Sequence, residues 1–184
     1  MTTPSVAVLL ADGAEPLEVT APVDAWRRGG VNVTLVALDS SRIVELAHDM
    51  RFNADALLAE TDLAQFDALF VPGGSMGVEN LLASTAVLDT VRTFAEAGKH
   101  VFAICAGPMV LNAAGILEGR RVTCYPGCQE DFPAGAYQGG GVMQDANLIT
   151  AAGPAYALEL GLACLAALTS EETARQVAAD MLMA

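Results

Sequence analysis

The chain has 184 residues and a formal net charge of −13, with nine Lys and Arg against 22 Asp and Glu. Hydrophobic residues make up 53% of it, which is enough to build a sizeable core and excludes global disorder. We expect a single domain over residues 1–184. So acidic a surface repels phosphate backbones and anionic lipids, so we expect neither nucleic acid nor a membrane as partner.

The sequence shows no targeting or membrane segment. No basic region precedes the short apolar run at residues 6–10, and the uncharged stretch 101–117 is interrupted by Gly and Pro. Four cysteines are too few and too widely spaced for a secreted disulfide scaffold. We therefore expect a reduced, cytoplasmic protein with free thiols.

Short apolar runs alternate with helix-like segments along the chain. In chain order we expect a strand at 5–10, a helix at 16–28 weakened by Pro22, a strand at 31–38, one or two short strands within 43–53, a strand at 67–71, a helix at 84–97, a strand at 100–104, a helix at 108–114, strands at 121–125 and 147–151, and helices at 155–168 and 171–182. This alternation predicts an α/β three-layer sandwich with a mainly parallel central sheet.

Three of the predicted strands end in segments with unusual residues. These segments are residues 12–15, 72–75 and 105–108. Because sites in open parallel sheets form beyond the carboxyl ends of the strands, we expect chemistry where the three segments converge.

Cys105 is the first candidate for that chemistry. It ends the strand at 100–104 and precedes a Gly-Pro helix start, a pattern typical of a sharp nucleophile elbow. The helix that follows would direct free N–H groups at the sulfur and lower its pKa, which favours the thiolate. The alternative interpretation is a buried cysteine that packs as a small hydrophobe.

Glu18 is the second candidate. It lies in the most apolar part of the first predicted helix, where an unpaired carboxylate is costly and the group tends to hold a proton. A protonated carboxyl can donate a hydrogen bond to a thiolate and later act as general acid and base. The alternative is a surface glutamate on an amphipathic helix.

Gly73 and Gly74 form the third element. A Pro-Gly-Gly stop after a strand can turn backbone N–H groups into an oxyanion-binding concavity, although a plain tight turn fits the spacing equally well. Cys124 and Cys128 lack a second pair of ligands, so we expect no metal site. Nucleotide-binding motifs are also missing, and we expect no cofactor.

The motifs together resemble the ThiJ/PfpI superfamily, in the branch typified by DJ-1. The resemblance rests on the run from Gly13 to Glu18, on Pro-Gly-Gly at 72–74, on Ala-Ile-Cys-Ala-Gly-Pro at 103–108, and on Gly153-Pro154. It extends over nearly the whole chain. It implies a flavodoxin-like sandwich that forms a homodimer.

The resemblance also implies roles for individual residues. Cys105 would be the nucleophile and the oxidation-sensitive thiol, Glu18 its carboxyl partner, and Gly74 and Ala106 the backbone N–H donors. Candidates for the pocket or the dimer edge are Tyr125, His48, Arg28 and Pro154. Tyr125 stands where relatives often have histidine, and His48 stands where they have arginine.

Two functions follow as expectations. The first is a cysteine-dependent, cofactor-free enzyme, glyoxalase III-like or deglycase-like, acting on small α-oxoaldehydes such as methylglyoxal. The alternative is an oxidative-stress sensor or chaperone-like dimer that uses an oxidisable Cys105 without turnover.

Overall fold

The computed structural model describes residues 3–183 and is built around a seven-stranded sheet of order β5-β2-β1-β6-β7-β9-β8. The strands are β1 (Ser5–Leu10), β2 (Asn32–Ala37), β5 (Ala56–Leu57), β6 (Ala68–Val71), β7 (His100–Ile104), β8 (Val142–Asp145) and β9 (Leu148–Ala151). All neighbouring strands are parallel except β8, which pairs antiparallel with β9. A separate hairpin joins β3 (Ile43–Glu45) to β4 (Arg51–Asn53).

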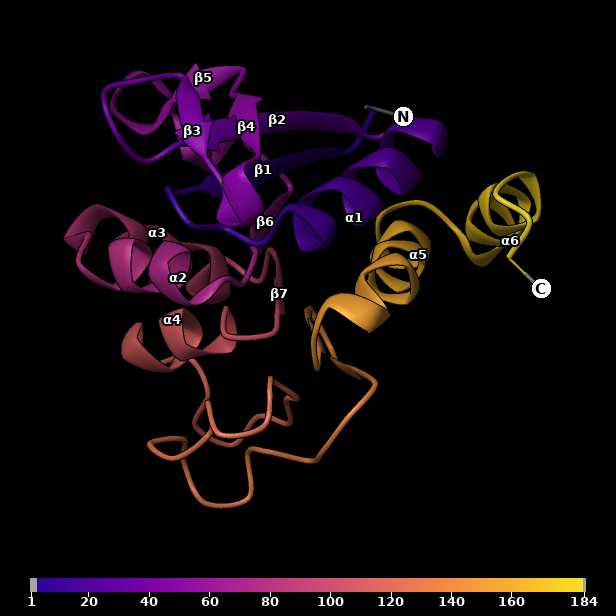
Figure 1. Cartoon of the computed structure of the whole chain (residues 1–184). Coiled ribbons are helices and arrows are strands. Elements are labelled where there is room, and N and C mark those ends of the chain that lie inside the picture. Colours follow the sequence, from indigo (N-terminus) through magenta and orange to yellow (C-terminus); the bar gives the residue numbers. More distant parts are fainter. Residues whose placement is uncertain (1–2, 184) are drawn as a thin grey trace.

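Helices cover both faces of the sheet. They are α1 (Pro16–Arg28), α2 (Ser75–Leu82), α3 (Thr85–Glu96), α4 (Pro108–Ala113), α5 (Ala157–Leu168) and α6 (Glu171–Asp180), with 3-10 turns at Ala47–Asp49, Leu58–Glu60, Leu63–Gln65 and Pro154–Tyr156. In Figure 1, α1, α5 and α6 lie on one side and α2, α3 and α4 on the other. This is the expected flavodoxin-like α/β sandwich.

The strands supply two hydrophobic cores because successive side chains point to opposite faces. In β1, Val6 and Val8 pack on the side of α1 and α5, whereas Ala7 and Leu9 pack on the side of α2 to α4. Trp26 of α1 is fully buried, and its ring meets Phe70 of β6 edge to face at 5.2 Å. The sheet is thus held rigidly, and its carboxyl edge is a stable platform.

The structure differs locally from the expected elements. Helix α1 continues through Pro22, which is buried in the contact with Gly161 of α5. Helix α2 and strands β5 and β8 lie outside the expected elements. Residues 121–125 do not form a strand, since only Val122 makes an isolated bridge, to Tyr137, within the long loop between α4 and β8. Within residues 3–183, no helix is both long and apolar enough to cross a membrane.

Candidate active site

A cavity of about 520 Å³ opens at the carboxyl ends of β1, β6 and β7. Its lining comes from the loop before α1, the turn of the β3–β4 hairpin, the starts of α2 and α4, and the loop after α4. The lining residues are Gly13, Glu15, Glu18, Ala47, His48, Gly74, Ser75, Met76, Cys105, Ala106, Tyr125, Cys128 and Pro154. The three segments expected to converge therefore do meet here.

Cys105 lies in a sharp turn between β7 and α4. Its φ of +61° is in the left-handed region, which non-glycine residues rarely occupy and which is common at functional sites. The turn is fixed on both sides, because the Cys105 N–H donates to the Ala151 carbonyl at 2.9 Å and its carbonyl accepts from the Tyr125 N–H at 2.9 Å. The predicted nucleophile elbow is thus present, and it holds the thiol at the cavity wall.

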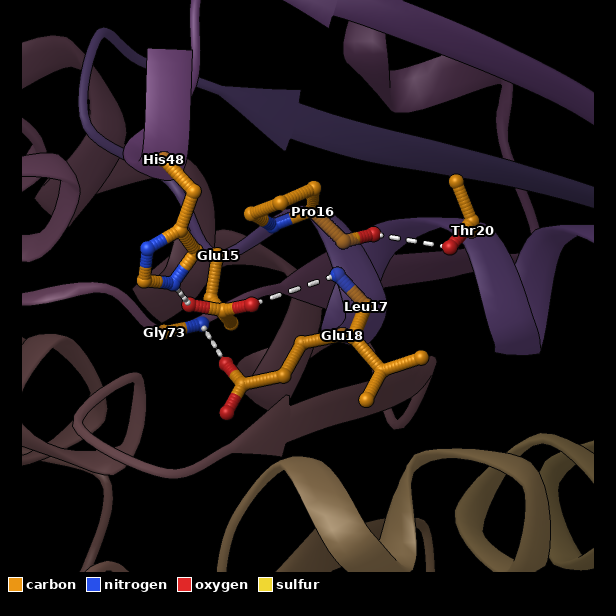
Figure 2. A network of polar contacts seen from close by, with 7 residues as sticks. All are labelled: Glu15, Pro16, Leu17, Glu18, Thr20, His48 and Gly73. Atoms are coloured by element: carbon orange, nitrogen blue, oxygen red, sulfur yellow. Dashed lines mark hydrogen bonds and ion pairs between the residues drawn. The ribbon is translucent and has the colours of Figure 1, made fainter. Parts of the chain in front are cut away.

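Glu18 reaches the same place from α1 and is completely buried. Its Oε2 accepts a hydrogen bond from the Gly73 N–H at 2.9 Å, shown in Figure 2, while Oε1 makes no hydrogen bond of regular length and angle within residues 3–183. Burial raises the pKa of this carboxyl to about 7, opposed by hydrogen bonding to Cys105 and Gly73 and assisted by the charge of Glu15. The expected protonatable carboxyl is therefore in place beside the cysteine.

The thiol of Cys105 differs from expectation. Burial, together with the charge and hydrogen bonding of Glu18, raises its pKa to about 12, and the N–H groups of Ala106 and Gly74 offset only part of this. A free thiolate beside an ionised Glu18 is thus disfavoured, and the predicted lowering is wrong for that state. Burial is the largest cause of that rise, and because the two groups oppose each other's negative charge, the thiolate is least disfavoured when Glu18 holds the proton.

Gly73 and Gly74 allow these groups to approach each other. A Cβ at Gly73 would lie 2.5 Å from the Glu18 Oε2 and 2.6 Å from the Cys105 Cβ, so no side chain fits between them. Gly74 has a φ of +94°, and a Cβ there would lie 2.3 Å from the Gly13 carbonyl oxygen. The Pro-Gly-Gly segment is therefore a structural requirement of the site and more than a tight turn.

The remaining predicted site residues divide into two groups. His48, Tyr125, Pro154 and Ala106 line the cavity. Arg28 does not: it pairs with Asp24 at 2.9 Å on the exposed side of α1 and faces α6. Arg28 is therefore not a residue of this pocket, since the last turn of α1 is far along the helix from Glu18, and its alternative place at a dimer edge stays a prediction.

Six residues of the cavity wall were not named individually from the sequence. They are Gly13, Glu15 and Ser75, which belong to the segments expected to converge, and Ala47, Met76 and Cys128, which do not. Glu15 caps α1 by accepting from the Leu17 N–H at 3.4 Å, a position that its place immediately before Pro16 could have indicated. Met76 belongs to the unpredicted helix α2. Within residues 3–183, no group of three or more His, Cys, Asp or Glu is placed to hold a metal ion.

The protein is a flavodoxin-like sandwich with a cysteine at a left-handed strand-to-helix turn, and this cysteine faces a buried glutamate. These features define a class of α/β proteins whose site is built around a cysteine. The chain matches the DJ-1/PfpI family over residues 4–167, and it belongs to that family. It is 34% identical over 180 residues to the Parkinson disease protein 7 homolog of Danio rerio, covering 96% of this chain and 95% of that protein.

Solved structures agree with this assignment. Oxidized DJ-1 of Toxoplasma gondii superposes with a TM-score of 0.95 at 31% identity, covering 99% of this chain and all of that one. DJ-1beta of Drosophila melanogaster superposes with a TM-score of 0.95 at 33% identity, with both chains fully covered. The chain is thus a DJ-1-like member of its family in both sequence and fold.

Proposed function

We propose that this protein is a cofactor-free enzyme of the glyoxalase III or deglycase type that converts small α-oxoaldehydes such as methylglyoxal to 2-hydroxy acids. One observation carries the proposal: a fully buried glutamate with a pKa of about 7 lies beside a cysteine at a cavity, and one of its oxygens makes no hydrogen bond of regular geometry within residues 3–183. A carboxyl that titrates near neutral pH is suited to move protons in both directions.

The first step joins Cys105 to the substrate. Its sulfur adds to the aldehyde carbon of methylglyoxal while Glu18 takes the thiol proton and passes it to the new oxyanion, so the product is a neutral hemithioacetal and Glu18 is again a carboxylate. General-base help from Glu18 fits the raised pKa of the thiol, since no free thiolate has to accumulate. The N–H groups of Gly74 and Ala106 are the donors nearest the sulfur and would stabilise the developing oxyanion.

The second step moves hydrogen within the substrate. Glu18 removes the proton from the carbon bonded to sulfur, and a proton returns to the neighbouring carbon, so the hemithioacetal becomes a lactoyl thioester on Cys105. Water then hydrolyses the thioester, which releases lactate and restores the thiol. The balance is one methylglyoxal and one water in, one lactate out, with no net oxidation.

The cavity favours small and neutral substrates. It contains two carboxyl side chains, Glu15 and Glu18, and no lysine or arginine is among its lining residues. An anionic oxo acid would meet repulsion there, whereas methylglyoxal would not. The aldehyde-derived adducts on which a deglycase acts pass through the same hemithioacetal chemistry.

The test is formation of lactate from methylglyoxal without glutathione. Wild-type protein should give many turnovers, measured as chiral lactate because loss of aldehyde alone can reflect trapping by thiols. Cys105→Ala should abolish turnover, and Glu18→Gln should lower kcat by about 10²-fold or more while the fold is retained. Stoichiometric loss of aldehyde without lactate would refute the proposal.

A second candidate function is a sensor of oxidative stress, a role that fits a DJ-1-like protein. The observation that favours it is that one similar solved structure, the DJ-1 of Toxoplasma gondii, is of an oxidized protein. Peroxide would oxidise the Cys105 thiol first to sulfenic acid and, with a second equivalent, to sulfinic acid. Each step reduces one hydrogen peroxide to water. A protonated Glu18 would then donate a hydrogen bond to the sulfinate.

Intact mass after mild peroxide treatment tests this second function. A gain of two oxygens that is lost in Cys105→Ser would support it, while unchanged mass would refute it. A protein with both the oxygen gain and lactate turnover would use one thiol for both.

We further propose that the protein is a homodimer. Leu17 of α1 and Met50 of the β3–β4 hairpin are each 51% exposed, and both segments lie beside the cavity, where the Ala47 N–H donates to the Ala14 carbonyl at 2.9 Å. Exposed apolar side chains of this kind favour an interface with a second copy. Light scattering should give twice the chain mass, and a Leu17→Glu, Met50→Glu variant should be a monomer.

A further inference from the structure

We propose that His48, held in place by Glu15, removes a proton from the water that hydrolyses the acyl group on Cys105. This assigns a second acid–base pair to the cavity, separate from Glu18. The inference rests on the proposed function, since it concerns the last step of that reaction.

The pair has the geometry of an oriented imidazole. The His48 Nε2 lies 3.0 Å from the Glu15 Oε2, and Figure 2 shows this ring nitrogen directed at the carboxylate. When Nε2–H donates to the carboxylate, Nδ1 carries the free lone pair and can act as base. Glu15 is itself held, because its other oxygen accepts from the Leu17 N–H.

The turn that carries His48 is tight and strained. His48 and Asp49 have φ of +60° and +57°, and the Met50 N–H donates to the Ala47 carbonyl at 3.4 Å, as in a type I′ hairpin turn. Glycine or asparagine usually occupies such positions. A histidine in this left-handed conformation, at the wall of the cavity, costs conformational energy that a simple connecting turn does not require.

Neighbouring segments fix this turn on the site. The Ala47 N–H donates to the Ala14 carbonyl at 2.9 Å, and the Gly13 N–H donates to the Glu45 carbonyl at 2.7 Å. The Glu15 N–H donates to the Gly73 carbonyl at 3.1 Å, and the N–H of the same glycine donates to Glu18. Gly73 therefore holds the main chain of Glu15 through its carbonyl and the carboxyl group of Glu18 through its N–H.

The difference in exposure assigns the two pairs to different steps. Glu18 is fully buried, so it can move protons between substrate atoms away from water. The His48 side chain is 71% exposed and lines the cavity, so it lies where water enters. A water at the imidazole can attack the thioester carbonyl: its proton goes to Nδ1, its oxygen bonds to carbon, and the C–S bond breaks. The proton then passes to the departing Cys105 sulfur.

The experiment uses p-nitrophenyl acetate, which acylates a reactive thiol without any glyoxalase chemistry. Release of nitrophenolate measures acylation of Cys105, and intact mass over time measures loss of the acetyl group, with Cys105→Ala for background. The variants are His48→Asn, which keeps the left-handed turn, and Glu15→Gln, which still accepts from the Leu17 N–H. Asp49→Asn is the matched control in the same turn.

His48→Asn should acylate at the wild-type rate and lose the acetyl group about 10²-fold more slowly, with added imidazole restoring the loss. Glu15→Gln should slow deacylation by a smaller factor, and Asp49→Asn should leave its rate unchanged. Equal deacylation in wild type and His48→Asn, or no acylation of the wild-type thiol, would overturn the inference. If the His48→Asn variant loses the acetyl group slowly but the wild-type protein makes no lactate, only the proposed function is refuted.

Discussion

Cys105 and Cys164 lie in very different surroundings, although burial raises the pKa of both thiols. Cys164 lies in the middle of α5 with no exposed surface, and burial is the only influence on its pKa. Cys105 has a carboxyl on one side, two backbone N–H groups near its sulfur and a cavity in front. The two thiols therefore differ in the groups that surround them, and not in whether burial disfavours their thiolate forms.

The largest expected difference between the two thiols is in their rates of alkylation. Iodoacetamide should label Cys105 in the folded protein at least about 10³-fold faster than Cys164, because Cys164 reacts only after unfolding. Peptide mapping by mass spectrometry gives both rates. Comparable labelling of the two cysteines in folded protein would break the comparison.

The buried carboxyl should make the stability of the protein depend on pH. Because the folded-state pKa of Glu18 is about 7 against 4.5 for the ordinary group, the folded state binds more protons and loses stability as pH rises from 4.5 to 7. Glu18→Gln should remove a loss on the order of 3 kcal/mol. Urea unfolding at pH 5 and pH 8 measures it.

The exposed Glu79→Gln is the control for that measurement, since it should leave the pH profile as in the wild type. An unchanged profile in Glu18→Gln would show that the carboxyl is not desolvated.

Clearance around Gly73 gives the next effect in size. Gly73→Ala should destabilise the fold by about 1–3 kcal/mol and separate Glu18 from Cys105, because its Cβ would overlap both residues. Gly140→Ala is the matched control, as a Cβ there meets nothing within 4 Å. Thermal unfolding and lactate turnover should both fall in the first variant only. Full activity in Gly73→Ala would contradict the described packing.

Cys164 should show the smallest effect, and on stability alone. Cys164→Ser places a hydroxyl in an apolar core and should cost about 1–2 kcal/mol, whereas turnover should stay as in the wild type. Denaturant midpoints and kcat from one preparation make the test. If the Cys164→Ser variant is fully folded and still loses turnover, this thiol also contributes to the reaction.

Much of the fold follows from local sequence because apolar runs and helix stops coincide. Strand β1 and helix α1 have the predicted bounds, since Asp12-Gly13 and Gly29-Gly30 end them. Polar and apolar residues alternate at 121–125 as they do in a strand, yet only Val122 forms a bridge there, to Tyr137. Helix α2 begins directly after Gly74 and contains Gly77, whose missing side chain lets it meet Ala14, so its pattern is too weak to predict a helix.

The site shows the same division. Cys105, Glu18 and the glycines at 73 and 74 follow from their motifs, because strand ends of a parallel sheet converge. The contact between His48 and Glu15 does not, since 33 residues separate them and a hairpin turn joins them only in the folded chain. The balance of charge and burial at Cys105 likewise depends on distances that no motif contains.

The crowding around Gly73 has a consequence for how this protein can change over time. The atoms around Gly73 leave no room for a methyl group, so a substitution there costs stability and displaces Glu18 or Cys105. The outer wall, by contrast, is made of half-exposed side chains such as Met76 and Tyr125. Residues at the rim of the cavity can therefore change across descendants of this chain while the packing around Gly73 is inherited unaltered.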